Sequence, residues 1–324
     1  MWERDGNKER LDRISEVFQK GEFLMDDEQL YGPKVKSDSK FKAKARLRQS
    51  KFRHNVLHGQ FDKYGSVLCE KAGSDGENFY NGFPVFNEVK KRYEEFQKPL
   101  YCNMLRSEHI PYNLFVPLKN NSDLAIFLFN DLLKISINKI ENILIEYAPS
   151  HKEEYLDDNT SFDTYVEYTY IDGKRGILGI EVKFSERAYP YGKTEKIRMN
   201  NPKSIYNVLK EKSKIYFPDC YESLKTPTYK QMWRNQLLGE AILEKDKEFD
   251  EFTSILVYPS QNKYIEEKAT KYKEEFLRPS SQKKFMAITY EDYLDALQRY
   301  NQEDNKNEEY DRWITYLRDR YIID

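Results

Sequence analysis

Residues 161–184 read SFDTYVEYTYIDGKRGILGIEVKF, and this stretch decides the fold class of the chain. In both halves apolar side chains alternate with polar ones, which is the pattern of a β-strand that buries one face. The halves are separated by Ile171-Asp172-Gly173, which has the composition of a tight turn. The stretch is therefore predicted to form two antiparallel strands joined by a short loop.

The length of that loop determines which residues of the two strands face each other. A two-residue turn at Asp172-Gly173 would place Asp163 opposite Val182, with the carboxylates of Asp163 and Glu181 turned apart. A three-residue loop with Gly173 in the left-handed conformation is another favoured hairpin, and it places Asp163 opposite Glu181.

Apolar matching favours the three-residue loop. In that register the apolar side chains of both strands lie on one face, and a slip by one residue would move them to opposite faces. Phe162, Val166 and Tyr168 are expected on the apolar face, whereas Asp163, Tyr165 and Glu167 are expected on the other. The predicted pairs are Tyr170 with Lys174, Phe162 with Val182, and Val166 with Leu178.

The polar face of this hairpin carries residues that are suited to metal-dependent hydrolysis. Glu181 and Lys183 are two residues apart and therefore share one face of their strand. Two facing carboxylates, Asp163 and Glu181, can hold a hard divalent cation through their oxygens. The ammonium group of Lys183 can orient an attacking water and neutralise charge on a phosphate. The alternative is a surface ladder of ion pairs in which Lys183 only neutralises the two acids.

Residues outside the hairpin are candidates for a supporting role. Glu146 ends the preceding strand and is a candidate third metal carboxylate. In the helix expected over 228–243, Arg234 falls near the middle of the apolar face and Gln231 towards its edge. Because a charged side chain on a core-facing stripe needs a partner, Arg234 either satisfies a carboxylate or approaches a phosphate.

The composition indicates an intracellular protein. The chain has 324 residues, of which 39 % are hydrophobic and 33 % charged, with a net charge of −2. Its three cysteines, Cys69, Cys102 and Cys220, are too far apart in sequence for a disulfide framework or a Cys-x-x-Cys metal site. The start of the chain is polar, and no apolar run approaches the roughly 18 residues of a membrane span. We expect a cytoplasmic protein with no membrane partner.

The net charge excludes a globally basic nucleic-acid binder, but the positive charge is concentrated locally. Residues 34–53 contain nine Lys or Arg and one acidic residue. The segment 187–203 also alternates bases with aromatic residues, which suits contact with a phosphate backbone. A solvated charged surface is the alternative for both segments. The candidate nucleic-acid-binding residues are Lys42, Lys44, Arg46, Arg48, Arg53, Arg187, Lys193, Lys196 and Arg198.

The order of expected elements predicts an α/β fold. Residues 121–258 contain a helix, three strands, a helix and a strand, and another strand follows at 285–289. We divide the chain into an N-terminal extension (1–120) with an amphipathic helix within 1–35 and the basic segment 34–53, a core (121–300), and a polar C-terminal helix or tail (301–324). The residues that follow Lys183, which include several prolines, are expected to form a long loop.

These features resemble the PD-(D/E)XK nuclease superfamily, which includes many restriction endonucleases. The resemblance is carried by SFD (161–163) and GIEVKF (179–184), with Phe162 where the motif has proline. RLRQSKFR (46–53), MLRSEHIPYNLFVPL (104–118) and MWRNQLL (232–238) are similar to a group of bacterial restriction endonucleases. The resemblance implies a restriction-endonuclease-like core with a mixed central sheet flanked by helices. It also implies a Mg²⁺ site (Mn²⁺ as substitute) formed by Asp163, Glu181 and the Val182 carbonyl, with Lys183 assisting the water.

The function implied is a metal-dependent endonuclease that cuts DNA, double-stranded in the first instance, in restriction or antiviral defence against foreign DNA. Two alternatives stay open at this point: a nuclease acting on RNA or on structured or single-stranded DNA, and a catalytically inactive nucleic-acid-binding module of the same fold. A pure scaffold is a third. A homodimer is expected because two sites related by a twofold axis make a double-strand cut simple.

Overall fold

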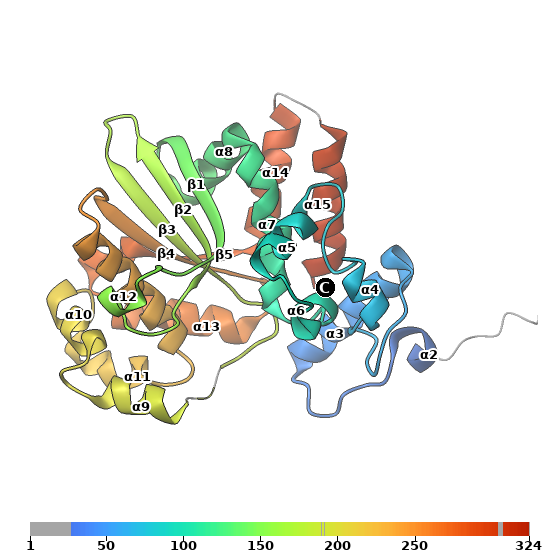
Figure 1. Ribbon diagram of the computed structural model, residues 1–324, viewed down its shortest axis with the longest axis horizontal. Coiled ribbons are helices and arrows are strands. Elements are labelled where there is room, and N and C mark those ends of the chain that lie inside the picture. The colour runs from blue at the N-terminus through green and yellow to red at the C-terminus, as the bar shows by residue number, and fades with distance from the viewer. Residues whose placement is uncertain (1–26, 189, 191, 304–306, 324) are drawn as a thin grey trace, which may run out of the picture.

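The protein is built around one mixed sheet of five strands with helices on both faces (Figure 1). The computed structural model describes residues 27–188, 190, 192–303 and 307–323. The amphipathic helix expected within residues 1–35 therefore lies mostly outside the described residues. The strands are β1 (Ile137–Tyr147), β2 (Phe162–Tyr170), β3 (Arg175–Val182), β4 (Glu251–Tyr258) and β5 (Phe285–Thr289).

Helices precede, interrupt and follow the sheet. Before it lie α2 (Asp27–Tyr31), α3 (Lys40–Phe52), α4 (Glu70–Ser74), α5 (Val85–Arg92), α6 (Lys98–Cys102), α7 (Ile110–Phe115) and α8 (Ser122–Leu133). Between β3 and β4 lie α9 (Lys193–Asn200), α10 (Ile205–Ser213), α11 (Tyr221–Leu224) and α12 (Lys230–Lys245). After β4 come α13 (Lys263–Lys271), α14 (Tyr290–Glu303) and α15 (Glu308–Tyr321).

The strands are arranged in the order of the sequence, and their directions follow from the connections. β1, β2 and β3 pair antiparallel, whereas β3, β4 and β5 pair parallel. A parallel pair needs a long crossover, which the helices between β3 and β4 supply. The expected α/β class with a mixed sheet is confirmed.

The hairpin of β2 and β3 has the register that the three-residue loop predicts. Val166 pairs with Leu178, and the backbone N–H of Tyr170 donates to the carbonyl of Lys174 over 2.9 Å. Gly173 closes the loop with φ +85°, a left-handed conformation that glycine adopts without the steric cost of a Cβ. Turn chemistry and apolar matching therefore selected the correct register.

Both faces of the sheet are covered, so the hairpin has no solvent-facing side. One core joins α8, α14 and α15 to Val166 and Leu178. The other joins α12 and α13 to Tyr165 and Ile177. Residues on the face of Glu181 are consequently buried beneath α12 and not displayed as a surface ladder.

Phe162 departs from the predicted face. Its ring packs against Phe252 and Tyr165 in the core beneath α12, not beside Val166. The close approach depends on Gly179, where a Cβ would lie 2.5 Å from the Phe162 ring. The alternation of faces thus breaks at the start of β2, next to Asp163.

The segment between β3 and α12 is helical where a long loop was expected. α9, α10 and α11 lie within it, and its prolines stand mostly outside them. Pro202 lies between α9 and α10, and Pro218 between α10 and α11. Proline is tolerated between helices and at their first turn, so its presence did not exclude short helices.

The C-terminal segment is part of the core, which corrects the expectation of a polar helix or tail. Trp313, Ile314 and Leu317 on α15 are buried in the same core as α8 and α14. The preceding helix, α14, begins with a reciprocal capping box: the Asp292 N–H donates to the Thr289 hydroxyl (3.0 Å), and the Thr289 N–H donates to the Asp292 carboxylate (3.1 Å).

Candidate active site

Glu181 and Lys183 lie together at the end of β3, beneath α12. Only 6 % of Glu181 and 8 % of Lys183 is exposed. The Lys183 ammonium nitrogen lies 2.5 Å from Glu181 Oε1. The second carboxylate oxygen, Oε2, accepts a hydrogen bond of 2.8 Å from the side-chain amide of Asn235 on α12. The orientation of the Glu181 carboxylate is thus determined from both sides.

Asp163 lies on β2, next to Glu181 of the adjacent strand β3. The regular pairing of the two strands ends with Thr164 opposite Ile180, and one further step brings Asp163 level with Glu181. Asp163 Oδ2 accepts a hydrogen bond of 2.7 Å from the backbone N–H of Val182. Burial, followed by the negative charges of Glu181 and Glu146, raises the pKa of Asp163 well above its usual range. Two carboxylates that repel each other in a buried place are a favourable environment for a cation.

Glu146 on β1 contributes a third acidic group to this electrostatic environment. Burial and then the charge of Glu181 raise the pKa of Glu146 to about 7. Its backbone has φ +56° within a strand, between the pairs of Ile145 with Thr164 and Tyr147 with Phe162. A non-glycine residue in this conformation carries strain, and such strain is commonly found at functional sites.

The backbone strain at Glu146 has a measurable consequence. Glu146→Gly should give a free energy of unfolding about 1 kcal/mol higher than Glu146→Ala, because only glycine adopts φ +56° without a steric cost. Both changes remove the same carboxylate, so their difference isolates the backbone. Urea denaturation of the two variants measures it, and equal stabilities would show that the conformation costs nothing.

The helix that covers the site contributes Asn235, which sequence reasoning missed. Gln231, one of the two polar residues predicted to support the site from that helix, lies one turn before Asn235 and is half-buried. Residues four apart share a helix face. Asn235 could therefore have been found as the buried amide in line with Gln231.

Arg234 binds carboxylates within the protein, which is the first of the two roles considered for it. Its guanidinium donates to Asp158 Oδ2 (2.8 Å), Glu195 Oε1 (2.7 Å) and the hydroxyl of Thr160 (2.9 Å). These contacts tie α12 to α9 and to the segment before β2. Arg234 satisfies two carboxylates, and the hydrogen bond to Glu181 comes from Asn235 instead.

Arg53 is not available to a nucleic acid, contrary to the sequence-based expectation. Only 3 % of the residue is exposed. Its guanidinium donates to the carbonyls of Gly65 (2.8 Å), Gly59 (2.6 Å) and Leu30. Arg53 therefore holds three segments of the N-terminal region together.

The other candidate nucleic-acid-binding residues of the 34–53 segment lie on α3. Arg46 is paired with Asp38 (2.6 Å), and Lys42 lies 3.7 Å from the same carboxylate. Arg48 donates to a backbone carbonyl of α15 over 3.2 Å. Lys44 is exposed. The positive charge of α3 is thus partly neutralised within the protein.

The basic residues that follow β3 are divided between its end and α9. Arg187 is exposed and lies four residues beyond Lys183. Lys193 and Lys196 are exposed on α9, whereas Arg198 pairs with Asp157 over 3.2 Å. Arg187 is the member of this group that is closest in sequence to Lys183.

The donors present fit a cation held by two carboxylates. In the described part of the chain, no group of three or more His, Cys, Asp or Glu side chains is close enough to hold a metal ion. A site here would therefore use Asp163, Glu181 and a backbone carbonyl, that of Val182, which follows Glu181 in β3 and whose N–H donates to Asp163. Carboxylate and carbonyl oxygens are the ligands that Mg²⁺ and Mn²⁺ prefer.

Comparison with known proteins agrees with the fold. A family model described as the PD-(D/E)XK nuclease superfamily matches residues 36–323, and the chain belongs to this superfamily. The superfamily implies nuclease activity, and hence a nucleic-acid substrate. No curated protein and no solved structure matches the chain. Among the described helices, none has the length and apolar character needed to cross a membrane.

Proposed function

We propose that this protein is a Mg²⁺-dependent endonuclease that hydrolyses phosphodiester bonds of double-stranded DNA and restricts foreign DNA. One observation carries the proposal: Asp163, Glu181 and Lys183 meet at the end of the β2–β3 hairpin. These are an acid pair and an amine in a buried place, the combination that metal-assisted phosphodiester hydrolysis needs.

Asp163, Glu181 and the Val182 carbonyl are the groups that would hold the ion. When bound, a divalent cation supplies Lewis-acid polarisation of the phosphate and neutralises its charge. Asn235 and Lys183 hold the Glu181 carboxylate in one orientation. The Val182 N–H holds the Asp163 carboxylate in the same way. Ligands that are oriented before binding lose little freedom when the ion and substrate arrive.

Lys183 supplies the positive charge at the position where the attack occurs. Its ammonium group can donate to the attacking water and to a phosphate oxygen on which charge develops in the transition state. The contact with Glu181 keeps the ammonium at the end of β3 before substrate binds. Lys183 thus has a role in positioning as well as in charge stabilisation.

Cleavage assays test the proposal directly. Purified protein is incubated with supercoiled plasmid, linear duplex, branched and single-stranded DNA, and RNA, in Mg²⁺, in Mn²⁺ and in EDTA. We expect metal-dependent nicking or linearisation of the plasmid, which requires no free end and therefore identifies an endonuclease. Cleavage of RNA alone would replace the DNA assignment, and no cleavage of any substrate would favour the inactive nucleic-acid-binding module.

Metal binding should be visible in the stability of the protein without any substrate. Mg²⁺ or Mn²⁺ at 100 times its dissociation constant should raise the free energy of unfolding by about 2.7 kcal/mol, because the ion binds the folded state alone. Asp163→Asn should lose this effect. Asp246→Asn is the matched control, since its carboxylate lies at the far end of α12 and accepts a hydrogen bond of 3.3 Å from the Tyr155 hydroxyl. Equal metal responses of the two variants in a thermal-shift titration would remove Asp163 from the site.

Two further parts of the proposal concern the cellular location and the oligomeric state of the protein. We propose a cytoplasmic homodimer, since two sites related by a twofold axis cut both strands of a duplex in one encounter. Light scattering after gel filtration, with and without duplex, measures the oligomeric state. A monomer under both conditions would leave two successive nicks as the route to a double-strand cut.

A further inference from the structure

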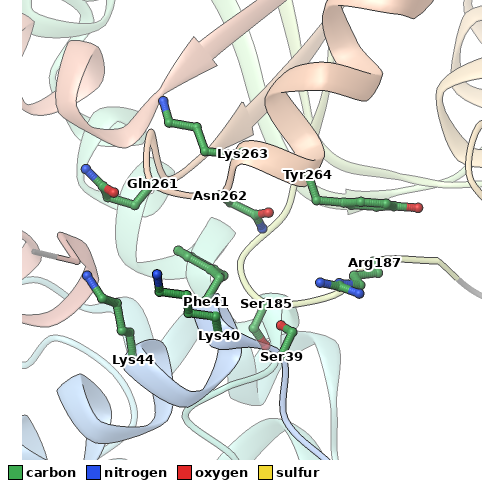
Figure 2. A pocket seen from close by; sticks show the side chains of 10 residues that line it. All are labelled: Ser39, Lys40, Phe41, Lys44, Ser185, Arg187, Gln261, Asn262, Lys263 and Tyr264. Atoms are coloured by element: carbon green, nitrogen blue, oxygen red, sulfur yellow. The ribbon is translucent and has the colours of Figure 1, made fainter.

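A basic pocket lies immediately beyond the candidate active site. It has a volume of about 360 Å³ and is enclosed by the start of α3, the residues that follow β3, and the start of α13 (Figure 2). Lys40 and Lys44 line it from α3, Arg187 from the segment after β3, and Lys263 from α13. Three segments far apart in the sequence thus bring four cationic side chains to one cavity.

The charge of this pocket favours an anionic ligand. No carboxylate is found among the described residues that line it. Lys263 has a partner in Glu266, 2.8 Å away, but that pair is largely exposed and therefore weak. Like charges within about 8 Å of one another repel under physiological salt, and a bound phosphate would relieve that repulsion.

The wall of the pocket is hydrogen-bonded to the residues that directly follow β3, next to Lys183. Asn262 is 3 % exposed, and its side-chain amide donates to the Phe184 carbonyl over 2.8 Å. Its side-chain oxygen accepts from the Ile265 N–H (3.3 Å), which fixes the start of α13. The Arg187 guanidinium lies over the ring of Tyr264, 5.3 Å from the centroid, and this stacking limits its freedom.

The distance between Lys183 and the pocket corresponds to a few nucleotides of a nucleic-acid strand. Ser185 lines the pocket and is two residues beyond Lys183, so their Cα atoms are at most about 7 Å apart. A nucleic-acid strand advances about 3.4 Å along the helix axis per nucleotide. A strand whose scissile phosphate lies at Lys183 therefore reaches the pocket within a few nucleotides.

We propose that this pocket binds a backbone phosphate of the substrate strand, a few nucleotides to one side of the scissile phosphate. The inference rests on the proposed function and adds to it a required substrate form: a continuous polynucleotide that extends beyond the cut. Arg187 and Lys263 grip the strand from opposite sides, while Lys183 and the acid pair act on the neighbouring phosphodiester.

The test compares two double variants of equal charge in a binding assay. Arg187→Gln/Lys263→Gln removes two cations of the pocket. Lys212→Gln/Lys247→Gln is the control, because both residues are exposed and lie around the end of α12, near the opposite end of the parallel strands. Binding is measured by fluorescence anisotropy with labelled 20-nucleotide probes of duplex DNA, single-stranded DNA and RNA. The buffer contains EDTA, so that cleavage does not interfere, and the salt concentration is varied.

We expect the pocket variant to bind the preferred nucleic acid roughly tenfold more weakly than the control. The slope of log K against log salt should fall by about 0.9 for each phosphate that the variant no longer neutralises. Inorganic phosphate and a mononucleotide, titrated as competitors at millimolar concentration, should displace little of the labelled strand. Unchanged affinity and slope would overturn the proposal, as would a wild-type protein that binds none of the three nucleic acids.

Two outcomes have distinct meanings. One would refute the proposed endonuclease activity but leave the pocket assignment in place, and the other would show that the pocket binds a small free phosphate and not a nucleic-acid strand. Salt-sensitive binding that depends on the pocket, in a protein that never cuts, would refute the endonuclease while the pocket assignment stands. Tight binding of the mononucleotide or of inorganic phosphate to the wild type, absent from the pocket variant, would assign the pocket to a small free phosphate ligand. That result would overturn the strand contact proposed here.

Discussion

Lys183→Met is expected to reduce the rate of cleavage roughly 10²- to 10⁴-fold, the range for losing one group that acts in the transition state. Methionine keeps the length and apolar stem of the buried side chain and removes only its charge. Glu181 keeps its hydrogen bond from Asn235, so the carboxylate remains oriented. Single-turnover cleavage at saturating substrate measures the rate, and anisotropy in EDTA should show affinity within a few-fold of the wild type.

Lys210→Met provides the matched control for this prediction. The Lys210 side chain is also buried, with its ammonium nitrogen 3.3 Å from the centroid of the Tyr221 ring, but it lies on α10 away from the acid pair. The control variant should cleave at nearly the wild-type rate. If Lys183→Met cleaves as fast as Lys210→Met, the ammonium group has no part in the reaction and the catalytic proposal fails.

Arg320→Met is expected to lower the free energy of unfolding by roughly 3–5 kcal/mol, because several buried acceptors would lose their donor. Arg320 is completely buried and donates to the Asn78 carbonyl (2.8 Å), Gln49 Oε1 (3.2 Å) and His109 Nε2 (3.0 Å). Burial and the charge of Arg320 lower the pKa of His109 well below its usual value, so the ring stays neutral and can accept. A loss of this size is a large part of the stability of a typical domain.

Arg318→Met is the control for Arg320→Met. It shows whether the loss of stability comes from the buried hydrogen bonds of Arg320 or from the removal of any positive charge on α15. Arg318 is on the same helix, and its half-exposed side chain pairs with Asp295 at 3.3 Å. A surface pair of this kind contributes less than about 1 kcal/mol. Urea denaturation of the two variants should therefore separate them clearly. Similar losses in both would show that the buried guanidinium contributes no more than a surface ion pair.

The hairpin and its register could be predicted because their causes are local. Alternation along β2 and β3 identifies the strands, and the left-handed Gly173 determines the length of the loop. Those two features place Asp163 level with Glu181 and put Lys183 on the same face. The start of β2 escaped prediction, because the position of Phe162 depends on Gly179 and Phe252, which belong to other strands.

The partners of individual charges could not be predicted in the same way. Arg53 looked like part of a basic surface because its neighbours in sequence are basic, yet carbonyls from three segments surround it. Asn235, and not Arg234, reaches Glu181 because the rotation of α12 is determined by packing on β3 and β4. The strained backbone of Glu146 is equally invisible in a sequence, since a φ angle within a strand depends on the pairing of its neighbours.

From the order of its residues alone, this chain determines five strands, a three-residue turn and an acid pair beside a lysine, because alternation and turn geometry act over a few neighbouring positions. Tertiary structure alone decides that Glu181 and Lys183 are buried beneath α12, that the last helix belongs to the core, and that three distant segments join in a basic pocket. The reason is physical: burial and charge pairing depend on which segments meet in space, and those contacts form only when the chain has folded.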